Sequence, residues 1–180
     1  MRRRIVLLPL IAVLALTLGL FAPATGSSGG PSAPSARTTP ENRVLVLGAD
    51  TFEANVLIQS TYRFSPDRIY VTSGERLRWI DEDEGNDPHT ITVVRRSQLP
   101  DAFSELFACD ACNDALDAHF SGPEPTIKVN RGRSGLNWPG DSLLQFPDDA
   151  LGAAVNAPSG TTLSYLCSIH LWMQGRITVI

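Results

Sequence analysis

Basic residues are scarce in this sequence outside its first few positions. The 180 residues include 15 Lys and Arg against 19 Asp and Glu, and three of the arginines are Arg2, Arg3 and Arg4. Without residues 1–24 the chain keeps 12 basic and 19 acidic residues, which gives a net charge of −7. An acidic surface of this kind excludes nucleic acid as a partner and gives no reason to expect attraction to an anionic membrane.

Cysteine is equally scarce, with only three residues in the chain. None lies near residue 24, so a lipid anchor attached through a cysteine at that point is excluded. Cys109 and Cys112 form a C-x-x-C pair, but no βαβ pattern surrounds them, which argues against a thioredoxin-like role. No His directly follows Cys112, so a covalent haem motif of the usual form is excluded as well.

The N-terminus has the three parts of a secretory signal peptide. Basic residues come first, an apolar run follows from Ile5 to Phe21, and the small-residue sequence Ala22-Pro23-Ala24 closes the segment. We therefore predict that residues 1–24 are a cleaved signal peptide. An uncleaved membrane anchor is the alternative, although the apolar run is slightly shorter than the roughly 20 residues that usually span a bilayer.

The mature chain is predicted to contain one domain. Residues 25–41 are rich in Gly, Ser, Pro and Thr, and such a segment buries too little surface to offset its ordering entropy, so we expect a disordered linker. Residues 42–180 suffice for a domain with its own core. We expect a monomer in the periplasm or outside the cell, with membrane contact only if the N-terminal segment stays uncleaved.

A loop near the C-terminus concentrates metal-binding side chains. Cys167, His170 and Met173 are separated by two residues each time, and thiolate, imidazole and thioether are soft or borderline ligands that select copper over magnesium or calcium. Because a tight loop presents its ligands from one side, a further ligand has to come from elsewhere. His89, at the start of an apolar run, is the obvious candidate. One Cys, two His and a weak Met form the ligand set of a blue-copper centre with one ion.

These motifs resemble those of the cupredoxins, most closely the amicyanin and plastocyanin-like branch. The resemblance covers residues 62–94 and 161–180, including the Pro88-His89 pair and the closing Gly175. It implies four copper ligands, which are His89, Cys167, His170 and Met173. Thr90 departs from the family, whose members often have Asn there, so we expect the hydroxyl of Thr90 or Ser168 to replace the usual hydrogen bond to the loop.

The cysteine count agrees with a metal-binding Cys167. Three cysteines in an exported protein leave one over after a single pairing, and a metal ligand explains the odd one. Cys109 and Cys112 are then the expected disulfide, because oxidising compartments favour such bonds. A thiol redox pair, or a second metal site completed by His119, is the alternative.

Short apolar runs separated by turn residues predict an all-β fold, a Greek-key β-sandwich of the cupredoxin type. The expected strands are 43–48, 55–59 (or a continuation of the first strand), 69–71, 77–80, 163–166 and 177–180.

Two segments do not follow the strand pattern. Residues 97–144 are predicted to be a partly helical insertion between the first His and the Cys-His-Met loop, with Pro100 at the first position of a helix. Short helices are expected to join around Cys109 and Cys112. The acidic run Asp81–Glu84 is interpreted as a solvated loop, or else as a docking face for a basic partner.

The predicted function is that of an electron carrier and not of an enzyme. A blue-copper protein of this kind would exchange single electrons with redox partner proteins by transient docking. A copper storage or delivery protein is the alternative, favoured by the second pair of cysteines and His119. A copper enzyme is disfavoured because a site with all its positions filled leaves none for substrate.

Overall fold

The computed structural model describes residues 42–180. The predicted signal peptide (1–24) and linker (25–41) lie outside the described residues. Within residues 42–180, no helix is both long and apolar enough to cross a membrane.

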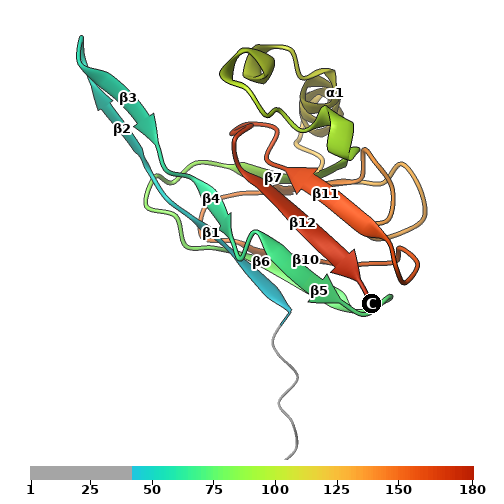
Figure 1. The fold of residues 1–180 in the computed structure, drawn as a ribbon. Coiled ribbons are helices and arrows are strands. Elements are labelled where there is room, and N and C mark those ends of the chain that lie inside the picture. The colour runs from blue at the N-terminus through green and yellow to red at the C-terminus, as the bar shows by residue number, and fades with distance from the viewer. Residues whose placement is uncertain (1–41) are drawn as a thin grey trace, which may run out of the picture. The chain divides into compact units, whose positions relative to one another are not determined.

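Two β-sheets face each other across one hydrophobic core (Figure 1). The four-stranded sheet has the order β10 (Ala150–Ala154), β6 (Arg76–Asp81), β1 (Arg43–Leu47), β4 (Arg63–Ser65). The six-stranded sheet has the order β5 (Arg68–Val71), β12 (Gln174–Val179), β11 (Thr162–Leu166), β7 (His89–Val94), β9 (Ser142–Gln145), β8 (Lys128–Val129). The chain crosses repeatedly between the sheets, as from β5 to β6 and from β6 to β7. The predicted all-β sandwich is confirmed.

Alternating side chains explain how the sheets enclose the core. In β6, Leu77 and Trp79 are fully buried while Arg76 and Arg78 are exposed, which is the period of a strand with one wet face. Trp79 meets Tyr165 of the opposite sheet edge to face, with ring centroids 6.0 Å apart. Such aromatic pairs from both sheets fix how the sheets pack.

Several strands were not foreseen from the sequence, among them β9 and β10. β9 lies inside the predicted insertion 97–144, and β10 follows it. All four residues of β9 are buried, so the strand lacks the alternation that identifies a half-buried strand. β10 is Ala-Leu-Gly-Ala-Ala, and alanine and glycine are depleted in strands.

The insertion is partly helical, as expected. It contains the 3-10 helices η1 (Arg96–Gln98) and η2 (Phe103–Phe107) and the α-helix α1 (Asp110–Phe120). The prediction for Pro100 was wrong, because η2 begins only at Phe103 after its N-cap Ala102. The insertion packs on the outer face of the six-stranded sheet, in a second apolar cluster that contains Val94 and Leu166. This second cover explains why every residue of β7 is buried.

A separate hairpin extends away from both sheets (Figure 1). It consists of β2 (Asp50–Glu53) and β3 (Leu57–Ser60), with Asn55 in the turn at φ 61°. The predicted strand at 55–59 is therefore part of this hairpin and does not continue β1. Every residue of the hairpin strands except Ser60 is exposed.

We predict that Gly175→Ala destabilises the fold by about 1–3 kcal/mol, the usual cost of overpacking a dense core. Gly175 lies opposite Tyr165 in the β11–β12 pair, and a Cβ at this position would overlap the Tyr165 ring. The urea midpoint measures the loss. Gly122→Ala, in an exposed loop where the added Cβ meets no atom closer than the Glu124 carbonyl oxygen at 3.3 Å, is the control. Equal midpoints for the two variants would contradict the prediction.

Candidate metal centre

Three side chains from different parts of the chain converge at one end of the sandwich. The Cys167 Sγ lies 3.8 Å from the Nδ1 atom of His89 and 3.8 Å from the Nδ1 atom of His170. The two Nδ1 atoms are 3.2 Å apart. His89 and Cys167 are fully buried, and His170 keeps 7% of its surface exposed. Among the described residues, these three form one of the groups whose ligand atoms all lie within 4.8 Å of one another.

Strand pairing explains why residues far apart in sequence meet here. β7 and β11 are antiparallel neighbours, so the first residue of β7, His89, lies beside the end of β11, where Cys167 follows. The loop after Cys167 then folds back on itself. The Met173 N–H donates to the His170 carbonyl at 2.8 Å, and the Cys167 N–H donates to the Met173 carbonyl at 3.0 Å. His170 is thereby held across from His89.

The sulfur of Cys167 is placed as a hydrogen-bond acceptor. It receives the backbone N–H of Thr90 at 3.3 Å and that of His170 at 3.4 Å. Burial raises the pKa of the Cys167 thiol, although these N–H groups act in the opposite direction because they favour the thiolate. Metal coordination would favour the thiolate further, since a bound cation lowers the pKa of its ligand.

The Thr90 hydroxyl makes the hydrogen bond to the ligand loop that was expected of Thr90 or Ser168. Its Oγ1 accepts the Ser168 N–H at 2.6 Å and lies 3.0 Å from the Thr92 hydroxyl. Thr92 in turn contacts the hydroxyls of Ser142 and Ser168 at 2.8 and 3.0 Å. This buried network attaches the ligand loop to β7 and β9, and that part of the prediction is confirmed.

Asp83 is a site residue that the sequence analysis missed. Its Oδ2 lies 2.7 Å from the His89 Nε2, and the two side chains are 1% and 0% exposed. Since a carboxylate only accepts, the Nε2 carries the proton and the Nδ1 offers its lone pair to the centre. Burial alone would raise the pKa of Asp83, but the bonds from His89, Asn86 and Gly85 outweigh it and lower that pKa.

The interpretation of Asp81–Glu84 as a solvated loop was therefore wrong for half of its residues. Asp81 is also buried, and burial raises its pKa to about 6. Only Glu82 and Glu84 face solvent. Charge runs normally mark a wet surface, and nothing in the sequence itself shows that Asp83 turns inward toward His89.

Tyr62 is a second residue without a sequence signal. Its ring is buried against both histidines, with centroids 5.1 Å from His89 and 4.4 Å from His170. The hydroxyl donates to the Asp87 Oδ2 at 2.5 Å. Burial raises the Tyr62 pKa, and the hydrogen bond to Asp87 and its charge add to this effect. The ring thus closes one side of the centre against water.

Met173 lies in the core beside this site. It is 1% exposed and belongs to the same apolar cluster as Cys167. Its backbone joins the ligand loop, as described above. Its role as an axial ligand stays a prediction.

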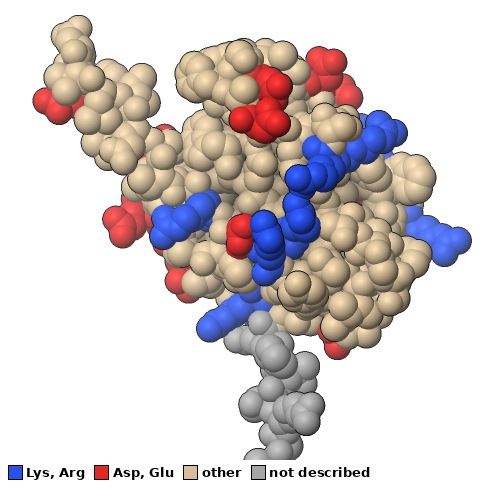
Figure 2. Space-filling view, in the orientation of Figure 1, with Lys and Arg blue, Asp and Glu red and all other residues tan. Residues whose placement is uncertain are grey.

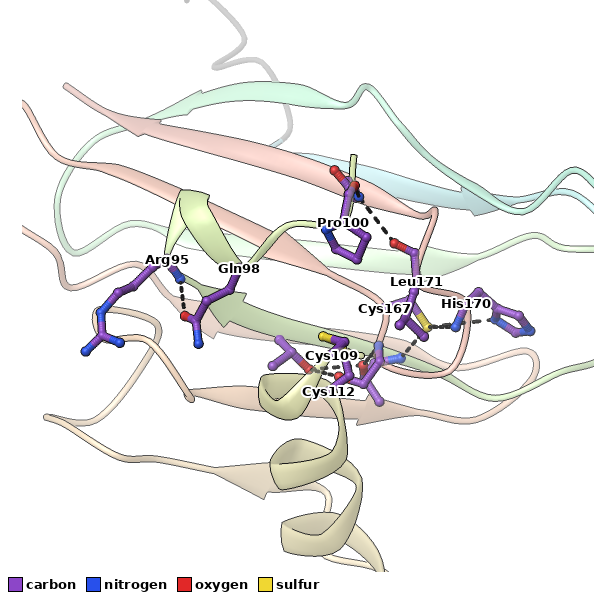
Figure 3. Close-up of a disulfide and its surroundings, with 12 residues drawn as sticks. Arg95, Gln98, Pro100, Cys109, Cys112, Cys167, His170 and Leu171 are labelled. Carbon is purple, nitrogen blue, oxygen red and sulfur yellow. Dashed lines mark hydrogen bonds between the residues drawn. A yellow bond between two sulfur atoms is a disulfide. The ribbon is translucent and has the colours of Figure 1, made fainter. Parts of the chain in front are cut away.

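Cys109 and Cys112 form a disulfide. It lies in the apolar cluster with Leu166 and Leu171, next to the loop that carries Cys167 and His170 (Figure 3). His119, the expected member of a second metal site, is fully buried, with its Nδ1 2.5 Å from the Thr126 carbonyl oxygen and its Nε2 2.7 Å from the Ser142 hydroxyl. The two cysteine sulfurs are thus bonded to each other, and the His119 ring connects α1 to Thr126 and to Ser142 of β9.

The donor set fits a borderline transition metal. Bonds of about 2.0 Å to imidazole nitrogen and about 2.3 Å to thiolate sulfur require donors roughly 3 to 4 Å apart on one ion, which are the separations observed between the three donor atoms. Hard cations such as magnesium and calcium prefer oxygen, which none of the three offers.

Comparisons with known proteins give only distant likenesses. No protein-family model matches the chain, and no curated protein matches it. The structure of a purple cupredoxin from Nitrosopumilus maritimus is 15% identical, with 77% of this chain and 98% of that chain covered and a TM-score of 0.42. Auracyanin A, a "blue" copper protein from Chloroflexus aurantiacus, is 17% identical, with 77% and 99% covered and a TM-score of 0.40. Oxidised plastocyanin from Dryopteris crassirhizoma is 21% identical, with 77% and 99% covered and a TM-score of 0.39. Likenesses this distant carry no conclusion about function.

We predict that Thr90→Val weakens the attachment of the ligand loop. Valine keeps the size of threonine but leaves the buried Ser168 N–H without its acceptor, which costs about 1–3 kcal/mol. Thr90→Ser retains the hydroxyl and is expected to recover much of the loss. Urea unfolding of the metal-free protein measures both. A valine variant as stable as the wild type would show that the hydroxyl does not hold the loop.

Proposed function

We propose that the protein binds one copper ion and carries single electrons between redox partners outside the cytoplasm. The observation that supports this most directly is the buried Cys167, His89 and His170 triad, with donor separations of 3.8, 3.8 and 3.2 Å. One thiolate and two imidazoles with a weak thioether are the ligands of blue-copper centres. The spacing of these residues in the sequence resembles that of the cupredoxins.

In this proposal Met173 supplies the weak axial contact. Its burial in the apolar cluster that also contains Cys167 supports this role, because a thioether held in such a core is shielded from water. Copper would supply the exchange of one electron between its two oxidation states. The protein's part is to keep the donors in place in both states.

Three features of the chain suit that task. β7 fixes His89 at one end, and Asp83 fixes the ring's orientation through its Nε2. The hydroxyl network of Thr90 and Thr92 holds the loop. Tyr62 covers both imidazoles. A site that needs little rearrangement lowers the barrier to electron transfer, since few charges and dipoles have to reorient.

The location outside the cytoplasm is supported by two observations. The N-terminal segment has the parts of a signal peptide, and the disulfide between Cys109 and Cys112 suits an oxidising compartment. Cleavage after residue 24 would release a soluble carrier, whereas an uncleaved segment would keep it at the membrane.

Copper storage or delivery is the alternative function. Cys109, Cys112 and His119 favoured it as further ligands, but these groups are engaged in a disulfide and two hydrogen bonds. Metal counting separates the two functions, because an electron carrier with this site binds one copper per chain.

We predict that the copper(II) protein shows an intense thiolate-to-copper band in the red part of the visible spectrum. Cys167→Ser is expected to abolish the band, since a hydroxyl does not replace the thiolate. His119→Gln is expected to keep both the band and the content of one copper per chain. A wild-type protein that binds copper without the band, or a His119 variant that loses a second ion, would contradict the proposed function.

Asp83→Asn is predicted to raise the reduction potential of the bound copper. The carboxylate increases the electron density on the His89 ring and so favours copper(II). Its neutral isostere is expected to shift the ratio of copper(II) to copper(I) affinity by about tenfold, which is ~59 mV for one electron. Redox titration against the wild type measures the shift. Glu84→Gln removes an exposed charge from the same loop and is the control. An unchanged potential in Asp83→Asn would show that the contact is only structural.

A further inference from the structure

The β2–β3 hairpin, called the arm below (residues 50–60), exposes large apolar side chains to solvent. Phe52 is 73% exposed, Val56 66% and Ile58 80%. The two strands pair only with each other within the described part of the chain. Isolated two-stranded ribbons are marginally stable at best, and clustered exposed apolar groups usually mark a contact surface.

The apolar face of the arm lies on the same side as the metal centre. Phe52 is paired with Ile58, and Asp50 is paired with Ser60. Since alternate residues of a strand share a face, Phe52, Ile58 and Asp50 point to the same side. The Asp50 carboxylate lies within 4.8 Å of a ring nitrogen of His170 and of the Asp87 carboxylate. The apolar pair therefore begins about 7 Å along the strand from the Asp50 carboxylate, which lies within 4.8 Å of His170.

A second exposed apolar group flanks the same histidine. Trp172 is 43% exposed, and its ring centroid lies 5.5 Å from that of His170. His170 is also the most exposed of the three converging donors. The histidine edge thus lies between Trp172 and the base of the arm, and a partner that covers both comes within reach of the centre.

The exposed charges on the arm and on the adjacent loop are acidic. Residues 48–62 and 81–89 contain no Lys or Arg. Asp50, Glu53, Glu82 and Glu84 are exposed, whereas Asp81 and the Asp83 side chain are buried. The nearest basic residue in sequence, Arg63, lies opposite Leu47 at the base of the arm. The acidic loop lies against the base of the arm, because the Glu84 N–H donates to the Gly48 carbonyl at 2.8 Å. In Figure 2 the arm shows acidic and no basic atoms, while the visible Lys and Arg atoms lie over the body of the molecule. Such a surface attracts a cationic partner and repels both an anionic membrane and a second copy.

We propose that the arm, Trp172 and an acidic rim (Asp50, Glu53, Glu82 and Glu84) dock a redox protein whose cofactor edge is surrounded by Lys and Arg. In this complex the apolar face of the arm packs against the partner, and the acidic rim attracts the basic surface of the partner toward the exposed edge of His170. The proposal rests on the proposed function and names the class of partner for the same centre. Interfaces of electron-transfer encounters are small and weak, so one projecting hairpin contributes a large share of the contact.

The test uses the copper-loaded protein and a lysine-rich c-type cytochrome as the probe. The double variant Phe52→Ser with Ile58→Ser is expected to slow electron exchange with the cytochrome by about tenfold. Exchange with a small inorganic complex, which needs no arm, is expected to stay unchanged. Tyr70→Ser is the matched control, since Tyr70 is an aromatic residue of β5, 66% exposed and outside the arm. Spectrum and copper content confirm an intact centre in each variant.

Charge is tested separately. Exchange between the wild type and the cytochrome is expected to slow as salt is added, and Asp50→Asn with Glu53→Gln is expected to weaken that salt dependence. Asp67→Asn with Glu124→Gln removes the same charge from exposed positions outside the arm and is expected to have little effect.

Several results would overturn the docking proposal. One is an arm variant that exchanges electrons with the cytochrome as fast as the Tyr70 variant. Another is a dimer, or binding to vesicles of phosphatidylcholine and phosphatidylglycerol, that the arm substitutions abolish, because the arm would then serve a second copy or a membrane. If the wild type exchanges no electrons even with the small complex, the proposed function itself fails, and the docking proposal falls with it.

Discussion

The pairing of β7 with β11 is the constraint on which the candidate centre depends. It brings His89 next to Cys167 across 78 positions of sequence. The same junction supplies the Thr90 N–H to the sulfur and the Thr90 hydroxyl to the Ser168 N–H. One residue thus holds both the ligand atom and the loop that carries it. The candidate centre therefore depends on the pairing of these two strands. Thr90 of β7 holds the Cys-His-Met loop by hydrogen bonds, in addition to the hydrogen bonds within the loop itself.

Burial shifts the pKa values of the three converging side chains, Cys167, His89 and His170. Desolvation raises the pKa of the Cys167 thiol and lowers the pKa of His89 and of His170, so without a metal the charged forms of all three are disfavoured. A bound cation reverses this preference for the sulfur and uses the neutral imidazoles as they are. Asp83, buried behind His89, adds a negative charge that further favours a cation. The polar interior is thus arranged for an ion.

The fold could be predicted from the sequence where one side of a strand is wet. β6 and β12 alternate between buried and less buried residues, and both were found. β9 is buried on both sides, and β10 consists of residues that rarely form strands, so neither produced a pattern. The hairpin was only half recognised, because its side chains face solvent on both sides and therefore follow no burial period.

The sequence by itself determined which residues are the candidate metal ligands. Ligand type and close spacing in one loop are local properties, and the odd cysteine supported the same choice. Only the tertiary structure decided what surrounds them. Asp83 and Tyr62 reach the centre through turns whose direction depends on contacts with distant strands, and a charge run or a lone tyrosine looks the same whether it faces water or a histidine. The face of the arm toward His170 was decided in the same way, by strand register that no single segment encodes.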